Sequence, residues 1–292
     1  MSAAATETPE SSPAPGRPAE IEAVSNLYLV HPASRAVASL LARTPITPNQ
    51  VSVAGVAAAG AAAWAYVSLP WPANAFCGLA LQVLWHVLDG ADGDLARRTG
   101  RASPLGELID GVCDHVGQAL IYVAIAAAAQ SRFGPLAWVL ASAAGASHFA
   151  QANAYESGRK AYRHWGYGAP WMRQTGAGAG FARTLSSLYL AVSSALSPGE
   201  GGAEAAMAAA LTRRRSTDVR TLYRERFAPL VKASGVLDSN TRTLAVFLAV
   251  LAGHPLWFFA FELTVLNLAL AMLLARRSKA NRALVAEFAA LP

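Results

Sequence analysis

The residues VSVAGVAAAGAAAWAYVSLP, at positions 51–70, form an uncharged run that consists largely of alanine, valine and glycine. A helix of twenty such residues is long enough to cross the ~30 Å hydrocarbon core of a bilayer. The whole chain has the same character, because 54% of its 292 residues are apolar and only 14% are charged. This composition is unusual for a water-soluble protein. The sequence therefore predicts a membrane protein.

Five further apolar stretches follow the first and complete the predicted bundle. The shortest of them must take in polar residues around Thr241 or lie tilted in order to span the bilayer. We expect an all-α, polytopic membrane helix bundle with six transmembrane helices. The further spans are predicted at residues 71–88, 105–130, 135–155, 244–253 and 256–274.

The distribution of basic residues predicts the orientation of the bundle. If the N-terminus is cytoplasmic, nearly all lysines and arginines fall in cytoplasmic segments, and the opposite connections contain only Arg132. This asymmetry is the positive-inside pattern. We therefore expect an integral protein of the bacterial inner membrane, with both termini and the active site facing the cytoplasm. The net charge of +6 is explained by topology and by attraction to anionic membrane lipids, so no nucleic-acid partner is expected.

Composition divides the chain into five parts. Residues 1–20 are rich in Ser, Pro, Ala and Glu, which predicts a disordered leader without a signal peptide. Residues 21–46 predict an N-terminal amphipathic interfacial helix. Residues 47–158 hold the first four spans, with a helix start at Thr47-Pro48. Residues 159–240 form a basic cytoplasmic insertion, and residues 241–292 hold the last two spans and a basic tail.

Two segments of the insertion have helical character. Residues 184–196 are apolar but too short for a span, and crossing there would place the basic tail outside. Residues 204–233 carry six arginines and predict one basic amphipathic helix at the cytoplasmic surface.

Acidic residues interrupt the apolar pattern at the end of the second predicted span, where residues 89–97 are DGADGDLAR. Asp89, Asp92 and Ala96 are spaced three and four residues apart, so they share one face of a helix. A short turn through Gly100 and Pro104 then leads into the third span. The second and third helices are therefore expected to be antiparallel neighbours.

The third span begins with a matching pattern, since residues 106–114 are GELIDGVCD. Gly106, Asp110 and Asp114 are spaced four apart and also share one helix face. If the two faces converge, four carboxylates lie in one cavity. Each carboxylate costs roughly 2.5–3.5 kcal/mol at the centre of a bilayer. Divalent cations can compensate this cost, and oxygen-only ligands indicate Mg²⁺, Mn²⁺ or Ca²⁺.

Other interpretations of the aspartates explain less of the pattern. An EF-hand loop requires Glu at its twelfth position, where this chain has Gly100 or Ser103. A solvated acidic loop would explain any one aspartate but not four at helical spacing. A divalent-cation transporter remains an alternative, because intramembrane carboxylates also line ion paths. That alternative leaves the paired glycines, Ala96 and Arg97 unexplained.

The pattern Asp-x2-Asp-Gly-x2-Ala-Arg-x8-Gly-x3-Asp-x3-Asp spans residues 89–114 and resembles the signature of the CDP-alcohol phosphotransferase (CDP-alcohol phosphatidyltransferase) family. The resemblance implies transfer of a phosphatidyl group from CDP-diacylglycerol to a polar alcohol, such as glycerol phosphate or inositol phosphate, with release of CMP. A variant of this chemistry moves a head-group phosphate from a CDP-alcohol to a lipid alcohol. The resemblance also implies a homodimer and a pair of Mg²⁺ or Mn²⁺ ions.

The resemblance assigns roles to individual positions. Asp114 would ligate metal and act as general base on the acceptor hydroxyl. Further ligands and the residues that would shape the nucleotide and diphosphate pocket complete the predicted site. The other metal ligands are Asp89, Asp92 and Asp110, and the pocket residues are Gly93, Ala96, Arg97 and Gly106, with Asn49 and Ser52 at the start of the first span.

Overall fold

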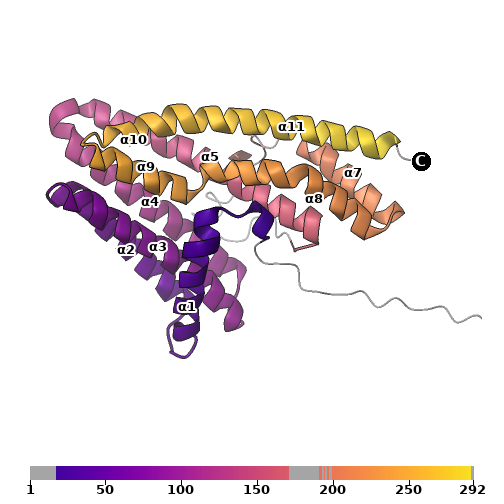
Figure 1. Cartoon of the computed structure of the whole chain (residues 1–292), viewed down its shortest axis with the longest axis horizontal. Helices are drawn as coiled ribbons and strands as arrows, with labels where there is room; N and C mark the ends of the chain where they lie inside the picture. Colours follow the sequence, from indigo (N-terminus) through magenta and orange to yellow (C-terminus); the bar gives the residue numbers. More distant parts are fainter. Residues whose placement is uncertain (1–17, 171–190, 193, 195, 197–198, 291–292) are drawn as a thin grey trace, which may run out of the picture.

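The computed structural model of the chain describes residues 18–170, 191–192, 194, 196 and 199–290. Every regular element in this part of the chain is a helix, which confirms the predicted all-α fold. Figure 1 shows the helices: α11 runs along the long axis of the molecule, and α2 and α3 are inclined to it. Their bounds are α1 His31–Leu41, α2 Pro48–Ser68, α3 Ala73–Arg98, α4 Pro104–Phe133, α5 Pro135–Tyr167, α7 Glu200–Arg213, α8 Ser216–Ala233, α9 Ser239–Leu251, α10 Leu256–Phe261 and α11 Asn267–Ala290, with short 3-10 or π turns η1 Ala19–Ile21, η2 Asn26–Val30, η3 Ser234–Leu237 and η4 Glu262–Leu266.

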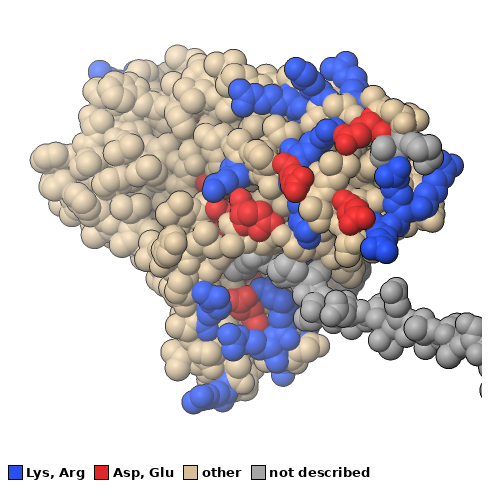
Figure 2. Space-filling model, turned by 45° about the vertical axis from the view of Figure 1, so that its right-hand side comes forward, with Lys and Arg blue, Asp and Glu red and all other residues tan. Residues whose placement is uncertain are grey.

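Helices occupy all six stretches predicted to cross the membrane. Three of the described segments are long and apolar enough to do so by length and composition: Pro48–Ser68, Leu105–Phe133 and Leu256–Ala290. On the face shown in Figure 2, charged side chains gather toward the right-hand end and on the lower projection, and the broad surface on the left is largely uncharged. A membrane helix bundle is therefore confirmed. The number of six crossings stays a prediction, because α3 and α5 carry several charged residues and α9 is short.

The first span begins where the sequence predicts. Thr47 is the N-cap of α2, and its side chain accepts a hydrogen bond from the backbone N–H of Gln50. The Gln50 side chain accepts one from the backbone N–H of Thr47 in return, at 2.9 Å. Pro48 takes the first helical position, where its missing N–H costs nothing. This capping box fixes the point at which α2 enters the bundle.

Small residues let α2 pack closely on both α3 and α4. The indole of Trp85 on α3 lies 3.3 Å from the position that a Cβ on Gly55 would occupy, and it packs still closer over Gly117 of α4. Between α2 and α3, the ring of Tyr66 on α2 fills the space where a Cβ on Gly78 of α3 would lie. The alanine-rich sequence of α2 is thus the contact surface for both of its neighbours.

The turn between α3 and α4 forms as expected, but the two helices that it joins pack little on each other. Gly100 adopts a positive φ of 66° just after α3 ends, and Ser103 caps α4 by accepting a hydrogen bond from Gly106. The sequence predicted that α3 and α4 would be packed neighbours. Instead, each packs chiefly on α2, so that α2 holds the two helices and their aspartates opposite each other.

α1 has the features of the predicted interfacial helix. It runs across the direction of α5 and α11 in Figure 1 and packs on α3. The hydroxyl of Ser34 donates a buried hydrogen bond to the carbonyl of Val87, at 2.9 Å. Leu40 of α1 and two residues of η2, Tyr28 and Leu29, are exposed instead. These apolar side chains are available to the membrane surface.

The end of α5, α7, α8 and the end of α11 form a second helical body, which we call the lobe. The helix predicted over residues 204–233 is in fact two helices, because the chain turns at Arg214, whose backbone is extended. The turn lets Met207 of α7 and Tyr223 of α8 enter the same apolar core as Tyr162 of α5. α5 continues through position 159, where the basic insertion was expected to begin.

The apolar segment predicted at residues 184–196 lies mostly outside the described residues. Residues 1–17 of the leader predicted at residues 1–20 lie outside them as well, whereas the end of that predicted leader belongs to the 3-10 turn η1.

Candidate metal centre

Three of the predicted aspartates meet between α3 and α4. One carboxylate oxygen each from Asp89, Asp92 and Asp110 lies within 4.8 Å of the other two. Asp92 is the most enclosed, with 3% of its surface exposed, whereas Asp89 and Asp110 are half-buried. The helical spacing within each motif segment therefore produces the convergence that the sequence predicted.

Asp114 completes the cluster one turn further along α4. Its side chain lies beside that of Asp89, and the side chain of Asp110 lies beside that of Asp92. Each contact joins α3 to α4. Four carboxyl groups this close repel one another when ionised, unless protons or cations lie among them. An all-oxygen donor set at this separation fits a hard divalent cation.

Ser52 is part of the cluster through Asp92. Its hydroxyl, buried near the start of α2, donates a hydrogen bond of 2.5 Å to Oδ2 of Asp92. The sequence interpretation placed Ser52 at the nucleotide, whereas here it fixes one oxygen of a carboxylate. Asn49 lies one turn earlier on α2 and is exposed.

The remaining motif residues lie toward the end of α3 and in the first turn of α4. Arg97 forms an ion pair with Asp94, and its guanidinium lies beside Gly93, 3.4 Å from where a Cβ would be. Because the side chain of Arg97 is about half exposed, it can exchange Asp94 for another anion. Gly106 donates its backbone N–H to Ser103 in the first turn of α4, at 3.1 Å. Ala96 is half-buried on α3.

Residues of α5 that are not among the predicted site residues also lie close to the cluster. Lys160 forms an ion pair with Glu107 of α4, at 2.7 Å, and a longer one with Glu156, at 3.9 Å. The charge of Glu156 acts on both Asp110 and Asp114. The spacing of Glu156 and Lys160 indicates a helical ion pair, but the contact with Glu107 depends on how α4 and α5 pack.

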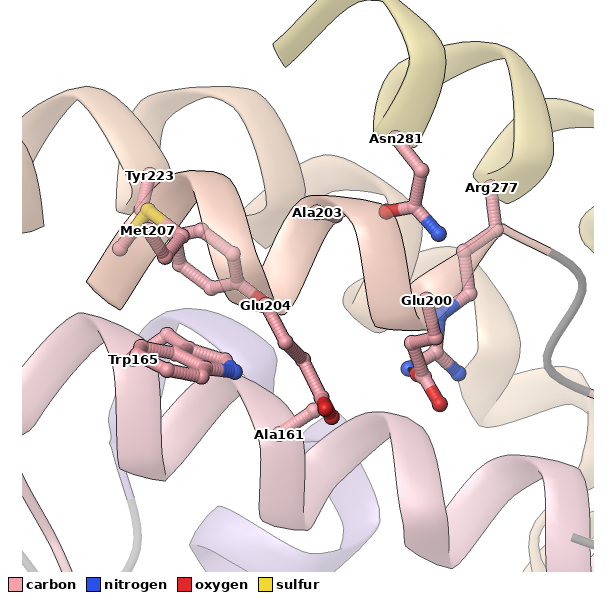
Figure 3. A pocket seen from close by; sticks show the side chains of 9 residues that line it. All are labelled: Ala161, Trp165, Glu200, Ala203, Glu204, Met207, Tyr223, Arg277 and Asn281. Atoms are coloured by element: carbon pink, nitrogen blue, oxygen red, sulfur yellow. Dashed lines mark hydrogen bonds and ion pairs between the residues drawn. The ribbon is translucent and has the colours of Figure 1, made fainter. Parts of the chain in front are cut away.

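A separate hollow lies in the lobe and contains none of the aspartates. Figure 3 shows Trp165 of α5 on one side and Arg277 of α11 beside Glu200 of α7 on the other. Arg277 and Glu200 form an ion pair. The hollow is thus the junction of the lobe helices, and the acidic cluster stays the candidate centre.

The fold and the cluster define an integral membrane protein with four carboxylates gathered between two helices. A comparison with family models identifies its family. The model described as CDP-alcohol phosphatidyltransferase matches residues 45–211, more than half of the chain, and the chain belongs to this family of phosphotransferases. The matched residues include α2 to α5 and the whole acidic cluster.

One curated relative is archaetidylinositol phosphate synthase of Aeropyrum pernix. The two sequences are 40% identical over 91 residues, which are 30% of this chain and 44% of the relative. The match therefore spans less than half of the relative's length.

Proposed function

We propose that the protein transfers a phosphatidyl-type group from a CDP-activated lipid to a phosphorylated polar alcohol and releases CMP. The observation that carries this proposal is the convergence of Asp89, Asp92 and Asp110, with Asp114 in contact with Asp89. A cluster of carboxylates at the membrane can bind the cations that a diphosphate requires.

Each aspartate has a proposed role. Asp89, Asp92, Asp110 and Asp114 would hold two divalent cations, Mg²⁺ or Mn²⁺, which would supply positive charge to the diphosphate. Asp114 takes the proton of the acceptor hydroxyl. The acceptor oxygen then forms a bond to the lipid-side phosphorus as the bond from that phosphorus to CMP breaks. Ser52 holds Asp92 in position throughout.

The nucleotide is proposed to lie over the start of α2 and the end of α3. Gly93 and Gly106 leave room for close approach, and Ala96 is small enough to line the same surface. Arg97 could exchange its ion pair with Asp94 for one with a phosphate oxygen of the nucleotide. The paired N–H donors of a guanidinium fit a phosphate group. Asn49 is exposed at the same end of α2.

Inositol phosphate is the favoured acceptor over glycerol phosphate, since a relative that shares part of the chain is named for an archaetidylinositol phosphate product. We place the site and both termini at the cytoplasmic face, on the basis of the charge asymmetry. A homodimer is a further expectation from the family.

The first test is CMP release by purified protein given a CDP-activated lipid and inositol phosphate, glycerol phosphate or inositol, with Mg²⁺, Mn²⁺ or a chelator. We expect release with the phosphorylated acceptor and a divalent cation, and none with the chelator. Sealed inside-out vesicles should be active toward added water-soluble acceptor, while right-side-out vesicles should not. Metal flux into vesicles without CMP release from any acceptor would instead establish a cation carrier.

Replacing the proposed base gives a sharper test. Asp114→Asn should lower kcat by roughly 10²- to 10⁴-fold, the usual contribution of a general base. Asp218→Asn is the matched control, because Asp218 is an exposed acid of α8 outside the cluster. An unchanged rate in Asp114→Asn would remove this role from Asp114.

A further inference from the structure

A buried arginine at the start of α9 joins three separate parts of the bundle. Arg242 is 1% exposed, and its Nε donates to Oε1 of Glu262 on η4 at 3.1 Å. Its Nη2 donates to Oε1 of Gln151 on α5 at 2.5 Å. Its Nη1 donates to the backbone carbonyls of Leu237 and Asp238, which precede α9. We call this set of contacts the Arg242 clasp.

Burial of the clasp has an unfavourable desolvation free energy. Glu262 and Gln151 are both 0% exposed, so the ion pair and its amide partner have no access to water. A buried ion pair of this kind is often no more stable than well-packed apolar residues of similar size. The ion pair instead fixes the relative positions of its partners, because the planar guanidinium donates hydrogen bonds only in fixed directions. The clasp therefore specifies where the start of α9 lies against α5 and η4.

The next residue of α9, Thr243, connects α9 to the helix that carries Asp89 and Asp92. Oγ1 of Thr243 lies 2.7 Å from Nε2 of His86, and both side chains are buried. His86 lies on α3, three residues before Asp89, so it is within one turn of the carboxylates. The start of α9 thus holds α3 through Thr243 and α5 through Arg242.

A positioning role follows from the way α3 and α4 are held apart. The two helices pack chiefly on α2 and little on each other, whereas α9 packs on α3 and α5 packs on α4. α3 and α4 are thus also joined through α9 and α5, and the hydrogen bond from Arg242 to Gln151 links those two helices. This chain of contacts includes α9, which lies outside the residues matched by the family model.

We propose that Arg242 and Thr243 are positioning residues that set the separation between the carboxylates of α3 and those of α4. Their effect on metal binding rests on the proposed function, but their effect on the helix separation does not. Groups that orient metal ligands from outside the coordination sphere typically change metal affinity by roughly 10- to 100-fold, and Arg242 and Thr243 would act on the ligands through the helices that carry them. We therefore expect their loss to change the metal dependence of the reaction more than the rate at saturating metal.

The experiment compares two replaced ion pairs. Arg242→Met/Glu262→Met removes the clasp but keeps the volume of its side chains, so the variant is expected to fold. Arg226→Met/Glu287→Met is the matched control, since this pair joins α8 to α11 in the lobe at 2.6 Å. Thr243→Val is a third variant, which removes only the hydroxyl that contacts His86.

Two measurements are made on each variant. Spin labels at Leu84 of α3 and Leu120 of α4, both exposed positions, report the helix separation without metal or substrate. Cys77 and Cys113 are replaced by Ala for this purpose. The Mn²⁺ concentration that gives half-maximal CMP release reports the metal site.

The clasp variant and Thr243→Val should shift or broaden the label distance relative to the control. Both should also require roughly 10- to 100-fold more Mn²⁺. A distance distribution equal to that of the control in both variants would overturn the proposal. Absence of CMP release by the unaltered protein would count against the proposed function alone, because the label distance still tests the positioning role.

Discussion

At the scale of single residues, Ser52 shows how a helix start contributes to a site formed by other helices. Its hydroxyl is held one turn inside α2 by the capping box and meets Asp92, forty positions further along the chain. The hydrogen bond favours one orientation of that carboxylate, and a metal ligand that is already oriented loses less entropy on binding.

Ser52→Ala should therefore raise the Mn²⁺ or Mg²⁺ concentration needed for half-maximal CMP release by roughly 10-fold or more. The rate at saturating metal should fall less. Ser39→Ala serves as the control, because the exposed hydroxyl of Ser39 bonds only to its own helix, at the carbonyl of Ala36. Equal metal dependence in the two variants would show that Ser52 does not orient a ligand.

The sequence predicted the aspartates better than their partners. Asp89 and Asp92, like Asp110 and Asp114, share a helix face through local spacing, and that spacing survives in any packing of the bundle. The contact between Ser52 and Asp92 depends instead on how α2 lies against α3. No local pattern encodes that arrangement, so the resemblance that places Ser52 at the nucleotide gave no sign of its bond to Asp92.

At the scale of helices, close packing in the bundle depends on individual glycines. A Cβ on Gly78 of α3 would lie 2.3 Å from the ring of Tyr66, which is buried and hydrogen-bonded to Gln82. The ring cannot move away without losing that bond. Gly145 of α5 has no neighbour within 4 Å of the same position.

Gly78→Ala should accordingly destabilise the protein by about 1–3 kcal/mol through overpacking. Gly145→Ala should leave stability unchanged or raise it, because alanine is the better helix former. Thermal unfolding in detergent measures both. A Gly78→Ala variant as stable as Gly145→Ala would contradict this prediction, because it would mean that α2 and α3 move apart at Tyr66 with little loss of stability.

The positions of the helices followed from apolar run length, but two packing features did not. The six arginines of residues 204–233 all follow residue 212, but no glycine or proline lies near Arg214 to indicate the turn there. Two of them, Arg220 and Arg224, donate hydrogen bonds to the final carbonyls of α5. Their function as caps depends on α8 folding back, which only the shared apolar core of the lobe requires.

At the scale of the whole molecule, the residues just before α1 connect the membrane bundle to the lobe. Ile21 is buried in the lobe core, and Glu22 forms an ion pair with Arg159 of α5. Glu20 accepts hydrogen bonds from the hydroxyls of Tyr162 and Tyr167. These bonds lower the pKa of Glu20 even though burial acts to raise it, so the carboxylate is ionised at neutral pH.

Ile21→Asp should detach this segment, because it places an unpaired charge in the lobe core. Limited proteolysis should then cut near residue 21 much faster than in the unaltered protein. Val24→Asp is the control, since Val24 is largely exposed. Equal cleavage of the two variants would contradict a docking role for Ile21.

The contact of Asn240 with Ser25 and Asn26 has a consequence for biosynthesis. Its side chain bonds to two residues that lie 215 and 214 positions earlier in the chain. At about 5–20 residues per second, a ribosome needs roughly 10–40 seconds to synthesise the intervening chain. During this interval the N-terminal helix has no partner on α9, and the exposed Tyr28, Leu29 and Leu40 can hold it on the bilayer surface until translation supplies one.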